Sequence, residues 1–391
     1  MKISDFRCSA SGQIHRSIAG IDTFVPALLA PTISYDSQLV LALSKADTAL
    51  SELSGVGRQL PNPHLFIAPY LRQEAILSSR IEGTRASLSE MLLDEMDEFD
   101  GEATGEVDRQ EVRNYIHAME LGILELHRGR PISLNLVQEL HAQLMIDVRG
   151  KLSSPGRFRT IQNWIGASSS DVHSAEYVPP PPELLMDLLS DWERFLNTSG
   201  EMPDLIQCAI LHEQFEAIHP FLDGNGRMGR LLITLFLMER GRLSQPLLYL
   251  SSHIEPRRRD YYELLQRVRT DGAWDTWIRF FLDGVEQTAR QAVQQTKRLM
   301  DLREDFRNRI RSKPKALALV DYLFGNPFIT AKRAQQFLNV SDPTARAAIG
   351  ALIDVGILTE WTERSWRRLY VCSPVLEVLS AVDQPETSSS L

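Results

Sequence analysis

The residues best suited to chemistry lie together in one short segment, residues 219–230, which reads HPFLDGNGRMGR. The segment holds a histidine, an aspartate, an asparagine, three glycines and two arginines. Residues 203–218 predict an apolar helix that Pro220 stops. Residues 225–240 predict a second helix, so we expect a tight glycine turn between two helices.

This turn is expected to bind an anion. The first amides of the second helix have no partner in their own helix, and with the positive end of the helix dipole they favour phosphate. Gly224 and Gly226 allow backbone conformations that other residues avoid. Arg227 and Arg230 share one helix face, from which guanidinium groups would pair with the outer phosphates.

Two further side chains stand at the mouth of the turn. Asp223 is a carboxylate beside a phosphate site, and Mg²⁺ takes one or two carboxylates together with phosphate oxygens. His219 is the group there that can accept a proton near pH 7. The residue types therefore predict a magnesium-bound phosphate next to a general base.

Other kinds of site fit the segment less well. Gly224, Gly226 and Gly229 spell G-x-G-x-x-G, but a helix rather than a strand precedes them, so a Rossmann dinucleotide site is rejected. The sequence contains no G-x-x-x-x-G-K-[ST] phosphate loop. His212 and His219 lie two helical turns apart without an H-E-x-x-H pattern, which leaves zinc as a weak alternative.

The segment resembles the signature of the Fic family, H-P-F-x-[DE]-G-N-G-R-x-x-R, at every specified position. Residues 161–178 are similar to the family's target-binding flap, and the resemblance extends over residues 71–285. It implies protein AMPylation with ATP as substrate and Mg²⁺ as cofactor. A Ser, Thr or Tyr hydroxyl of an unknown target protein, or of the chain itself, would attack the α-phosphorus, and pyrophosphate would leave.

The resemblance also implies a role for each matching residue. His219 would take the proton, Asp223 would bind Mg²⁺, Phe221 would anchor the loop, Gly224, Asn225 and Gly226 would hold the α- and β-phosphates, and Arg227 and Arg230 would clamp the β- and γ-phosphates. The flap would grip the target backbone as an added strand. The adenine pocket is expected near the flap and near Tyr261 and Tyr262, without assigned contacts.

A second motif lies earlier in the chain. Ser78 to Gly83, SSRIEG, resembles the family's inhibitory motif, [ST]-x-x-x-E-[GN]. Ser78 and Glu82 are four residues apart on one helix face, and Glu82 would pair with Arg230 and displace the γ-phosphate. Two alternatives stay open: an ordinary surface glutamate near a helix end, and a glutamate that positions water to remove AMP from a modified protein.

The elements around these motifs are mostly helical. Predicted helices cover residues 37–53, 69–81, 112–127, 133–145, 183–196, 203–218, 225–240, 256–270 and 273–310. Residues 1–35 are expected to be irregular, residues 90–111 an acidic surface loop, and residues 156–182 a β-hairpin that ends in four prolines. The fold class is therefore all-α, a Fic-type helical bundle with one β-hairpin flap.

The last part of the chain predicts a small winged helix-turn-helix domain. Between residues 311 and 375 nine basic side chains stand against five acidic ones, whereas the whole chain carries a net charge of −9. Such an asymmetry is typical of a module that faces nucleic acid. Two alternatives have equal weight: DNA binding by a regulator whose Fic body senses a nucleotide, and a winged helix used only for packing or dimerisation.

Length and composition indicate how the chain divides into domains and where it works. The 391 residues are expected to divide into an N-terminal helical region with the inhibitory helix (1–110), a catalytic core (111–285), a linker helix (286–312) and a winged-helix domain with a tail (313–391). Three scattered cysteines fit neither a disulfide framework nor a zinc site. With no signal peptide or membrane span in view, a cytoplasmic protein is expected, and a homodimer stays open.

Overall fold

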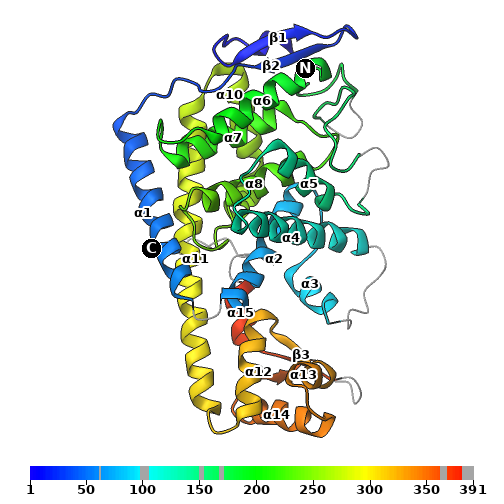
Figure 1. Ribbon diagram of the computed structural model, residues 1–391, viewed down its shortest axis with the longest axis vertical. Helices are drawn as coiled ribbons and strands as arrows, with labels where there is room; N and C mark the ends of the chain where they lie inside the picture. The colour runs from blue at the N-terminus through cyan, green and yellow to red at the C-terminus, as the bar shows by residue number, and fades with distance from the viewer. Residues whose placement is uncertain (61–62, 97–104, 149–153, 167–170, 362–367, 381–391) are drawn as a thin grey trace, which may run out of the picture.

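The fold is seen in a computed structural model, which describes residues 1–60, 63–96, 105–148, 154–166, 171–361 and 368–380. Most of these residues are helical, which confirms the prediction of an all-α protein. In Figure 1 a broad helical body forms the upper part of an elongated molecule, and a smaller C-terminal bundle forms the lower part. Among the helices described, none combines the length and apolar composition that a membrane crossing requires.

The helices and strands follow one another along the chain, with the longest connection between Leu144 and Leu185. The body contains β1 (Gly12–Arg16), β2 (Asp22–Pro26), α1 (Ser37–Gln59), α2 (Pro63–Ile81), α3 (Leu88–Asp94), α4 (Glu106–His127), α5 (Leu134–Leu144), α6 (Leu185–Asn197), α7 (Asp204–Ile218), α8 (Asn225–Glu239), α9 (Ser251–Ile254), α10 (Arg258–Asp271) and α11 (Trp274–Ile310). The C-terminal part contains α12 (Pro314–Gly325), β3 (Phe328–Thr330), α13 (Ala331–Leu338), α14 (Asp342–Asp354), β4 (Thr359–Glu360), β5 (Leu369–Val371) and α15 (Ser373–Ser380).

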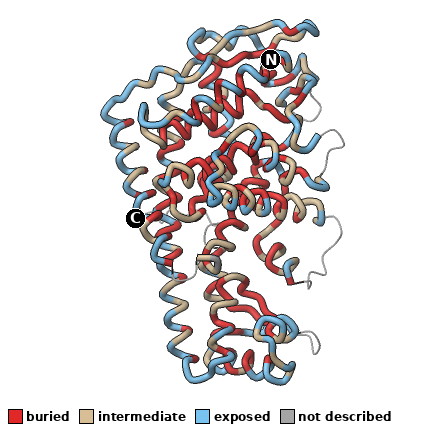
Figure 2. Tube along the Cα trace, in the orientation of Figure 1, coloured by how far each residue is buried: buried red, intermediate tan, exposed pale blue. Residues whose placement is uncertain are grey.

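Helices α7 and α8 form the centre of the body. Every residue of α7 from Leu205 to Ile218 is buried, and in Figure 2 the buried segments gather in the interior of the body. A helix that is surrounded on all sides needs apolar residues all round, and the run LIQCAIL provides them. The loop between α7 and α8, residues 219–224, is therefore held between two buried helices.

Two long helices run side by side along one edge of the molecule, α1 and α11 (Figure 1). Asp36 caps α1, because its carboxylate accepts a hydrogen bond from the Leu39 amide at 2.8 Å. Small side chains on α11, such as Ala289 and Ala292, are buried and allow close approach. Residues 286–310 belong to this continuous helix, as the predicted helix over residues 273–310 implied, and the division of the chain into domains stays a prediction.

The N-terminal region contains a β-hairpin, so the expectation that residues 1–35 are irregular was wrong. Strands β1 and β2 pair antiparallel, with Ile14 opposite Phe24. The buried Phe24 ring packs 6.2 Å from the ring of Tyr177, and the Phe24 amide donates to the Val178 carbonyl at 2.9 Å. The hairpin is thus stabilised by its contact with the far end of the flap, which local sequence does not reveal.

The flap itself, residues 161–178, contains less strand pairing than expected. In its described part the only strand contact is one antiparallel bridge between Ile165 and Tyr177, and residues 167–170 of the predicted turn lie outside the described residues. The prediction of regular strands over residues 156–182 was too strong. Side chains such as Arg159 and Asn163 instead bond to the end of α7.

Helix α2 begins at Pro63, six positions before the predicted start at Pro69. Pro69 lies inside the helix, where a proline removes one backbone hydrogen bond. The buried Phe66 ring packs 5.8 Å from that of Phe324 on α12, and this packing offsets the loss. Because α2 also carries Ser78, one helix connects the C-terminal part to the centre of the body.

The C-terminal part combines helices α12 to α15 with a small sheet of order β3-β5-β4. Residues 362–367 of the predicted wing lie outside the described residues. Arg72 on α2 pairs with Glu95 through Nη2 at 2.7 Å and donates through Nη1 to the Gly325 carbonyl at 2.8 Å. The Asn326 side chain donates to the Leu92 carbonyl at 3.0 Å. These contacts fix the C-terminal part against α2 and α3.

Candidate active site

Two left-handed residues close the loop between α7 and α8. His219 ends α7 with a φ of 50°, and Gly224 precedes α8 with a φ of 77°. A left-handed residue after the last helical turn reverses the chain sharply. At Gly224 a Cβ atom would also lie 2.8 Å from Met145 Sδ. The predicted glycine turn between two helices is confirmed.

Asn225 braces this loop from inside. Its Oδ1 accepts a hydrogen bond from the Phe221 amide at 2.8 Å, and its Nδ2 donates to the Phe221 carbonyl at 2.8 Å. These two bonds turn the buried side-chain amide toward Phe221. A phosphate contact of Asn225 would therefore come from its backbone amide rather than from its side chain.

Phe221 is completely buried beneath the loop and stacks on His141 of α5, with ring centroids 3.6 Å apart. His141 Nδ1 accepts a hydrogen bond from the Gly156 amide at 3.0 Å. The other nitrogen, Nε2, therefore carries the hydrogen and donates to the Asp223 carbonyl at 3.0 Å. Burial lowers the pKa of His141 to about 4, which keeps the ring neutral in this arrangement.

His219 stands where α7 ends and the loop begins. Its amide donates to the Phe215 carbonyl at 2.9 Å, and its carbonyl accepts from Arg159 Nε at 2.9 Å. Within the described residues, its Nδ1 has no hydrogen-bond partner. Burial, followed by the positive charges of Arg159 and Arg269, lowers the pKa of His219 to about 3. The imidazole is therefore neutral at pH 7 and able to accept a proton.

Asp223 lies at the edge of the same loop with half of its side chain exposed, 50%. Its Oδ1 accepts a hydrogen bond from the Gly224 amide at 2.6 Å. The described part of the chain contains no cluster of three or more His, Cys, Asp or Glu side chains suited to a metal. A Mg²⁺ ion held through one carboxylate and the oxygens of a phosphate needs no such cluster, so Asp223 fits this role.

The start of α8 faces the carboxylate of Glu82. A Cβ atom at Gly226 would lie 2.3 Å from Glu82 Oε1 and 3.0 Å from Arg230 Nη1. The absence of a side chain at Gly226 thus leaves space for a negatively charged group against the first amides of the helix. A carboxylate is favoured there for the same reason as a phosphate.

Arg230 binds the carboxylate of Glu82. Its Nη2 donates to Glu82 Oε1 at 2.7 Å and to the Ser78 carbonyl at 2.9 Å, while its Nε donates to Ser78 Oγ at 2.9 Å. The contact between Glu82 and Arg230 that the sequence motif suggests is therefore present. The Arg230 side chain is only 1% exposed and that of Glu82 is 34% exposed, so the carboxylate has the freedom to leave.

Arg227 lies one turn before Arg230 and has different partners. Its Nη1 is 3.3 Å from Glu111 Oε2, and its Nη2 is 3.7 Å from Met145 Sδ and 3.9 Å from Asp223 Oδ1. In the described residues, Nε and Nη1 of Arg227 and Nη1 of Arg230 are buried without a hydrogen bond. Unsatisfied guanidinium donors at the start of α8 fit a ligand with several anionic oxygens.

The side chains of His212 and Glu213 on α7, which are of types that can bind a metal, make other contacts. His212 Nε2 lies 2.8 Å from the Tyr261 hydroxyl, and Glu213 pairs with Arg269 at 3.0 Å. These buried contacts give no support to the zinc alternative. They also place Tyr261 in the core, so of the two tyrosines expected near an adenine base only Tyr262, 38% exposed, presents a ring to solvent.

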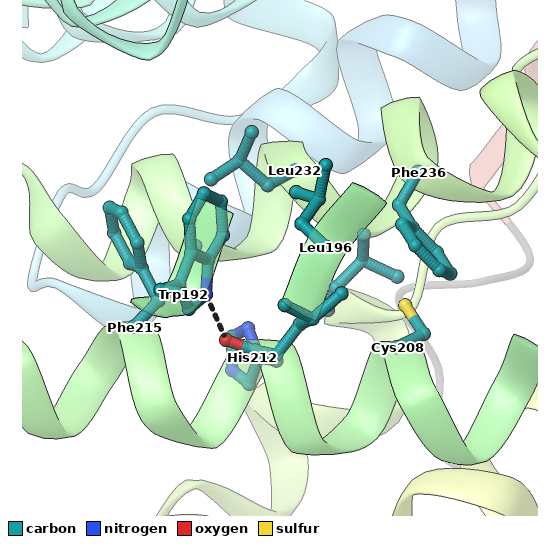
Figure 3. A pocket seen from close by; sticks show the side chains of 10 residues that line it. Trp192, Leu196, Cys208, His212, Phe215, Leu232 and Phe236 are labelled. Carbon is teal, nitrogen blue, oxygen red and sulfur yellow. Dashed lines mark hydrogen bonds between the residues drawn. The ribbon is translucent and has the colours of Figure 1, made fainter. Parts of the chain in front are cut away.

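A small cavity lies behind the loop, between α6, α7 and α8 (Figure 3). Its volume is about 20 Å³, room for roughly one water molecule. Trp192, Phe215 and Phe236 contribute to an apolar lining, and the Trp192 indole donates to the Leu211 carbonyl at 2.9 Å. This cavity is too small to hold a nucleotide.

Comparison with known proteins agrees with this geometry. Residues 40–124 match the family profile described as "Fic/DOC family N-terminal", and residues 131–237 match "Fic/DOC family". The chain is 30% identical over 216 residues to "Protein adenylyltransferase Fic" of Culex quinquefasciatus, covering 53% of this chain and 39% of that protein. It is 28% identical over 251 residues to the Drosophila yakuba protein of the same name, covering 63% and 46%. The chain thus spans less than half the length of these relatives.

Solved structures show the same fold. A Fic family protein from Desulfovibrio desulfuricans G20 aligns with a TM-score of 0.59 at 22% identity, covering 88% of this chain and 98% of that one. Fic-1 from C. elegans, residues 134–508, aligns with a TM-score of 0.51 at 22% identity, covering 68% and 74%. Because two profiles of the family match in succession and the second encloses the complete residue 219–230 signature, the chain belongs to the Fic/DOC family.

Proposed function

We propose that this chain transfers AMP from ATP to a Ser, Thr or Tyr hydroxyl of a protein, with release of pyrophosphate. One observation carries the proposal: His219 and Gly226 flank one loop, and the Arg230 guanidinium lies 3.0 Å from the position of a Gly226 Cβ. The relatives named protein adenylyltransferase support the same activity. The intact Arg227 and Arg230 favour a triphosphate donor.

The proposed reaction needs positioning and charge neutralisation more than covalent chemistry. The target oxygen attacks the α-phosphorus, the bond from that phosphorus to the bridging oxygen of the β-phosphate breaks, and the electron pair leaves with pyrophosphate. The hydroxyl proton goes to the neutral imidazole of His219. The pKa of this histidine, about 3 in the substrate-free site, would rise beside the negative triphosphate, toward the range in which a base works best.

The first amides of α8, at Asn225 and Gly226, would hold the α- and β-phosphates, and Arg227 and Arg230 would hold the β- and γ-phosphates. Asp223 would hold Mg²⁺, which supplies neutralisation of the phosphate oxygens. The half-exposed Asp223 carboxylate and the unsatisfied guanidinium donors support these assignments.

Glu82 and Ser78 would restrain this activity. The Glu82 carboxylate lies against Gly226 and binds Arg230 at 2.7 Å, which is where the outer phosphate of ATP would lie. Two anions cannot share the same donors, so ATP would bind productively only when Glu82 leaves. The same residue could also orient water for the removal of AMP, but the names of the relatives favour transfer.

The flap, residues 161–178, would dock the target backbone beside His219. The C-terminal part, with its order of helices and antiparallel strands, would be a winged helix, and DNA binding by its basic side chains stays a prediction, as do a homodimer and a cytoplasmic location. The comparisons do not favour the alternative in which the Fic body only senses a nucleotide.

Incubation with ATP labelled at the α-phosphate, in parallel with ATP labelled at the γ-phosphate, tests the proposal. Protein label is expected from the α-labelled form only, more of it in Glu82→Gly, and none in Glu82→Gly/His219→Ala. Label from the γ-phosphate would instead indicate a kinase. Equal labelling of Glu82→Gly and Glu82→Gly/His219→Ala would contradict the role of His219 as the base.

A further inference from the structure

Hydrogen bonds from Arg159 and from the flap hold the last turn of α7 and the start of the loop after it. Five consecutive carbonyls accept such bonds: Ala217 from the Tyr177 hydroxyl at 2.8 Å, Ile218 from Arg159 Nη2 at 3.3 Å, His219 from Arg159 Nε at 2.9 Å, Pro220 from the Arg159 amide at 2.9 Å, and Phe221 from Asn163 Nδ2 at 2.9 Å. The last carbonyls of a helix have no partner in their own helix. Here Arg159 and two residues of the flap, Asn163 and Tyr177, provide these partners.

Arg159 is the centre of this connection. It contributes three of the five bonds, and its Nη2 also donates to the Pro180 carbonyl at 2.5 Å. Residue 159 precedes the flap and residue 180 follows it, so one guanidinium joins both ends of the flap to the backbone of His219. The bridge between Ile165 and Tyr177 lies just beyond and keeps the two ends together.

Arg159 is an unusual residue to bury for packing alone. It is 3% exposed, and within the described residues no carboxylate lies within ion-pair distance of it. A buried charge without a counter-ion is costly unless its hydrogen bonds are many and well placed. All partners of Arg159 are backbone carbonyls, and two of them belong to Ile218 and His219. A planar guanidinium is suited to hold such a set in fixed geometry.

We propose that Arg159 is a positioning residue, which fixes the His219 imidazole relative to the flap so that a target segment docked there presents its hydroxyl to the base. This inference rests on the proposed AMP transfer. It also explains why His219 keeps a left-handed conformation, φ 50°, that few non-glycine residues adopt. The hydrogen bonds of the Arg159 guanidinium hold the backbone of His219 in that conformation.

Kinetics of self-labelling in the Glu82→Gly background test the role of Arg159. At saturating ATP and Mg²⁺ we expect Arg159→Ala to lower the rate of label incorporation by about 100-fold, as misplacement of a reacting group by an ångström can. The ATP concentration for half-maximal rate should change by less than about twofold, because the lost contact is not one to ATP. Arg159→Lys keeps the charge without the fork and should recover part of the rate.

Arg157 provides the matched control, since it is an exposed arginine two positions earlier. Arg157→Ala should leave the rate and the half-saturating ATP concentration unchanged. If Arg159→Ala weakens ATP binding as much as it lowers the rate, or if neither changes, the proposal is wrong.

A second readout is independent of activity. Hydrogen exchange at the Ile165 and Tyr177 amides should accelerate in folded Arg159→Lys but not in Arg157→Ala. Unchanged exchange contradicts the proposal even if Glu82→Gly itself takes up no label, in which case the proposed function fails separately. Accelerated exchange in that same case would support the connection between Arg159 and the flap without the reaction.

Discussion

The carboxylate of Glu82 lies 2.7 Å from the Arg230 guanidinium and within 2.3 Å of the position that a Cβ of Gly226 would occupy. One side chain thus touches both an arginine and the amide end of α8, the two groups that a triphosphate needs. The proposed ATP binding and its inhibition by Glu82 therefore depend on the same groups, and single substitutions there should change both.

Removal of the Glu82 side chain should increase ATP binding. Hydrogen bonds to charged groups contribute about 1.5–3 kcal/mol, so Glu82→Gly is expected to bind ATP roughly 10- to 100-fold more tightly. Isothermal titration with ATP and Mg²⁺ measures this change. Glu90, the partly exposed capping residue of α3, gives a control, because Glu90→Gly should leave ATP binding as it is. Equal affinities of wild type and Glu82→Gly would contradict the competition.

A methyl group at Gly226 should block the phosphate site. In the Glu82→Gly background the space over Gly226 is open to ATP, and Gly226→Ala fills it close to Arg230. We expect ATP binding to fall by about 100-fold or more, because the lost amide contacts are charge-assisted. Gly350 on α14 has no neighbouring atom within 4 Å of the position that a Cβ would occupy, so Gly350→Ala is the matched control. Undiminished ATP binding by the Gly226→Ala variant would place the nucleotide elsewhere.

The two hydrogen bonds of the His141 ring should stabilise the folded chain. His141→Phe keeps the stack on Phe221 but leaves the Asp223 carbonyl and the Gly156 amide without partners, which should lower the free energy of unfolding at pH 7 by about 1–3 kcal/mol for each group. Denaturant titration measures this loss. The exposed His117 on α4 is the control, and His117→Phe should stay within about 0.5 kcal/mol of wild type.

The same variant should also lose part of the pH dependence of stability. The pKa of His141 is about 4 in the folded chain and about 6.5 in the unfolded one, so as the pH falls below 6.5 the unfolded chain binds the proton first. The His141 contribution to stability is then lost between pH 6.5 and 4, by up to about 1.4 kcal/mol per pH unit. The difference between wild type and His141→Phe should narrow over this window, and a constant difference would show that His141 is not held neutral.

Asp223 should determine the magnesium requirement. Chelation of divalent cations is expected to stop labelling, and Asp223→Asn should raise the Mg²⁺ concentration for half-maximal labelling by roughly 10- to 100-fold. Asp223→Glu should retain most activity, since either acid satisfies the motif. Because the side chain is half exposed, the thermal midpoint should barely move. An Asp223→Asn protein with an unaltered Mg²⁺ requirement would exclude this residue as a ligand.

The sequence was most informative where the site is local. The turn from His219 to Gly224 and the helix that starts at Asn225 are visible in one short motif, because proline and glycine act over a few residues. The contact between Glu82 and Arg230, which are 148 residues apart, was expected from the resemblance to the family's inhibitory motif. For Asn225 the motif predicted a place in the phosphate site but no role for its side chain. Its bonds to Phe221 close the loop from within, and a motif does not specify which of its polar atoms face a ligand.

Residues that reach the loop from distant positions and belong to no recognised motif were not predicted. His141 and Arg159 reach the loop from positions 82 and 60 residues away from their partners, and no spacing rule connects them to it. The flap was predicted as a hairpin from its β-branched residues, yet its polar groups bond to α7 instead. The β1–β2 hairpin escaped notice for the converse reason, since its stability depends on Phe24 packing beside Tyr177.

Intact-protein mass spectrometry of Glu82→Gly after incubation with ATP and Mg²⁺ tests the central claim most directly, because the mass increment identifies the transferred group. We predict an increment of one adenylate or more, absent from Glu82→Gly/His219→Ala. An unchanged mass in both proteins, with ATP bound in both, would contradict self-modification by AMP transfer. An increment of a single phosphate would contradict the assignment of the α-phosphorus as the point of attack.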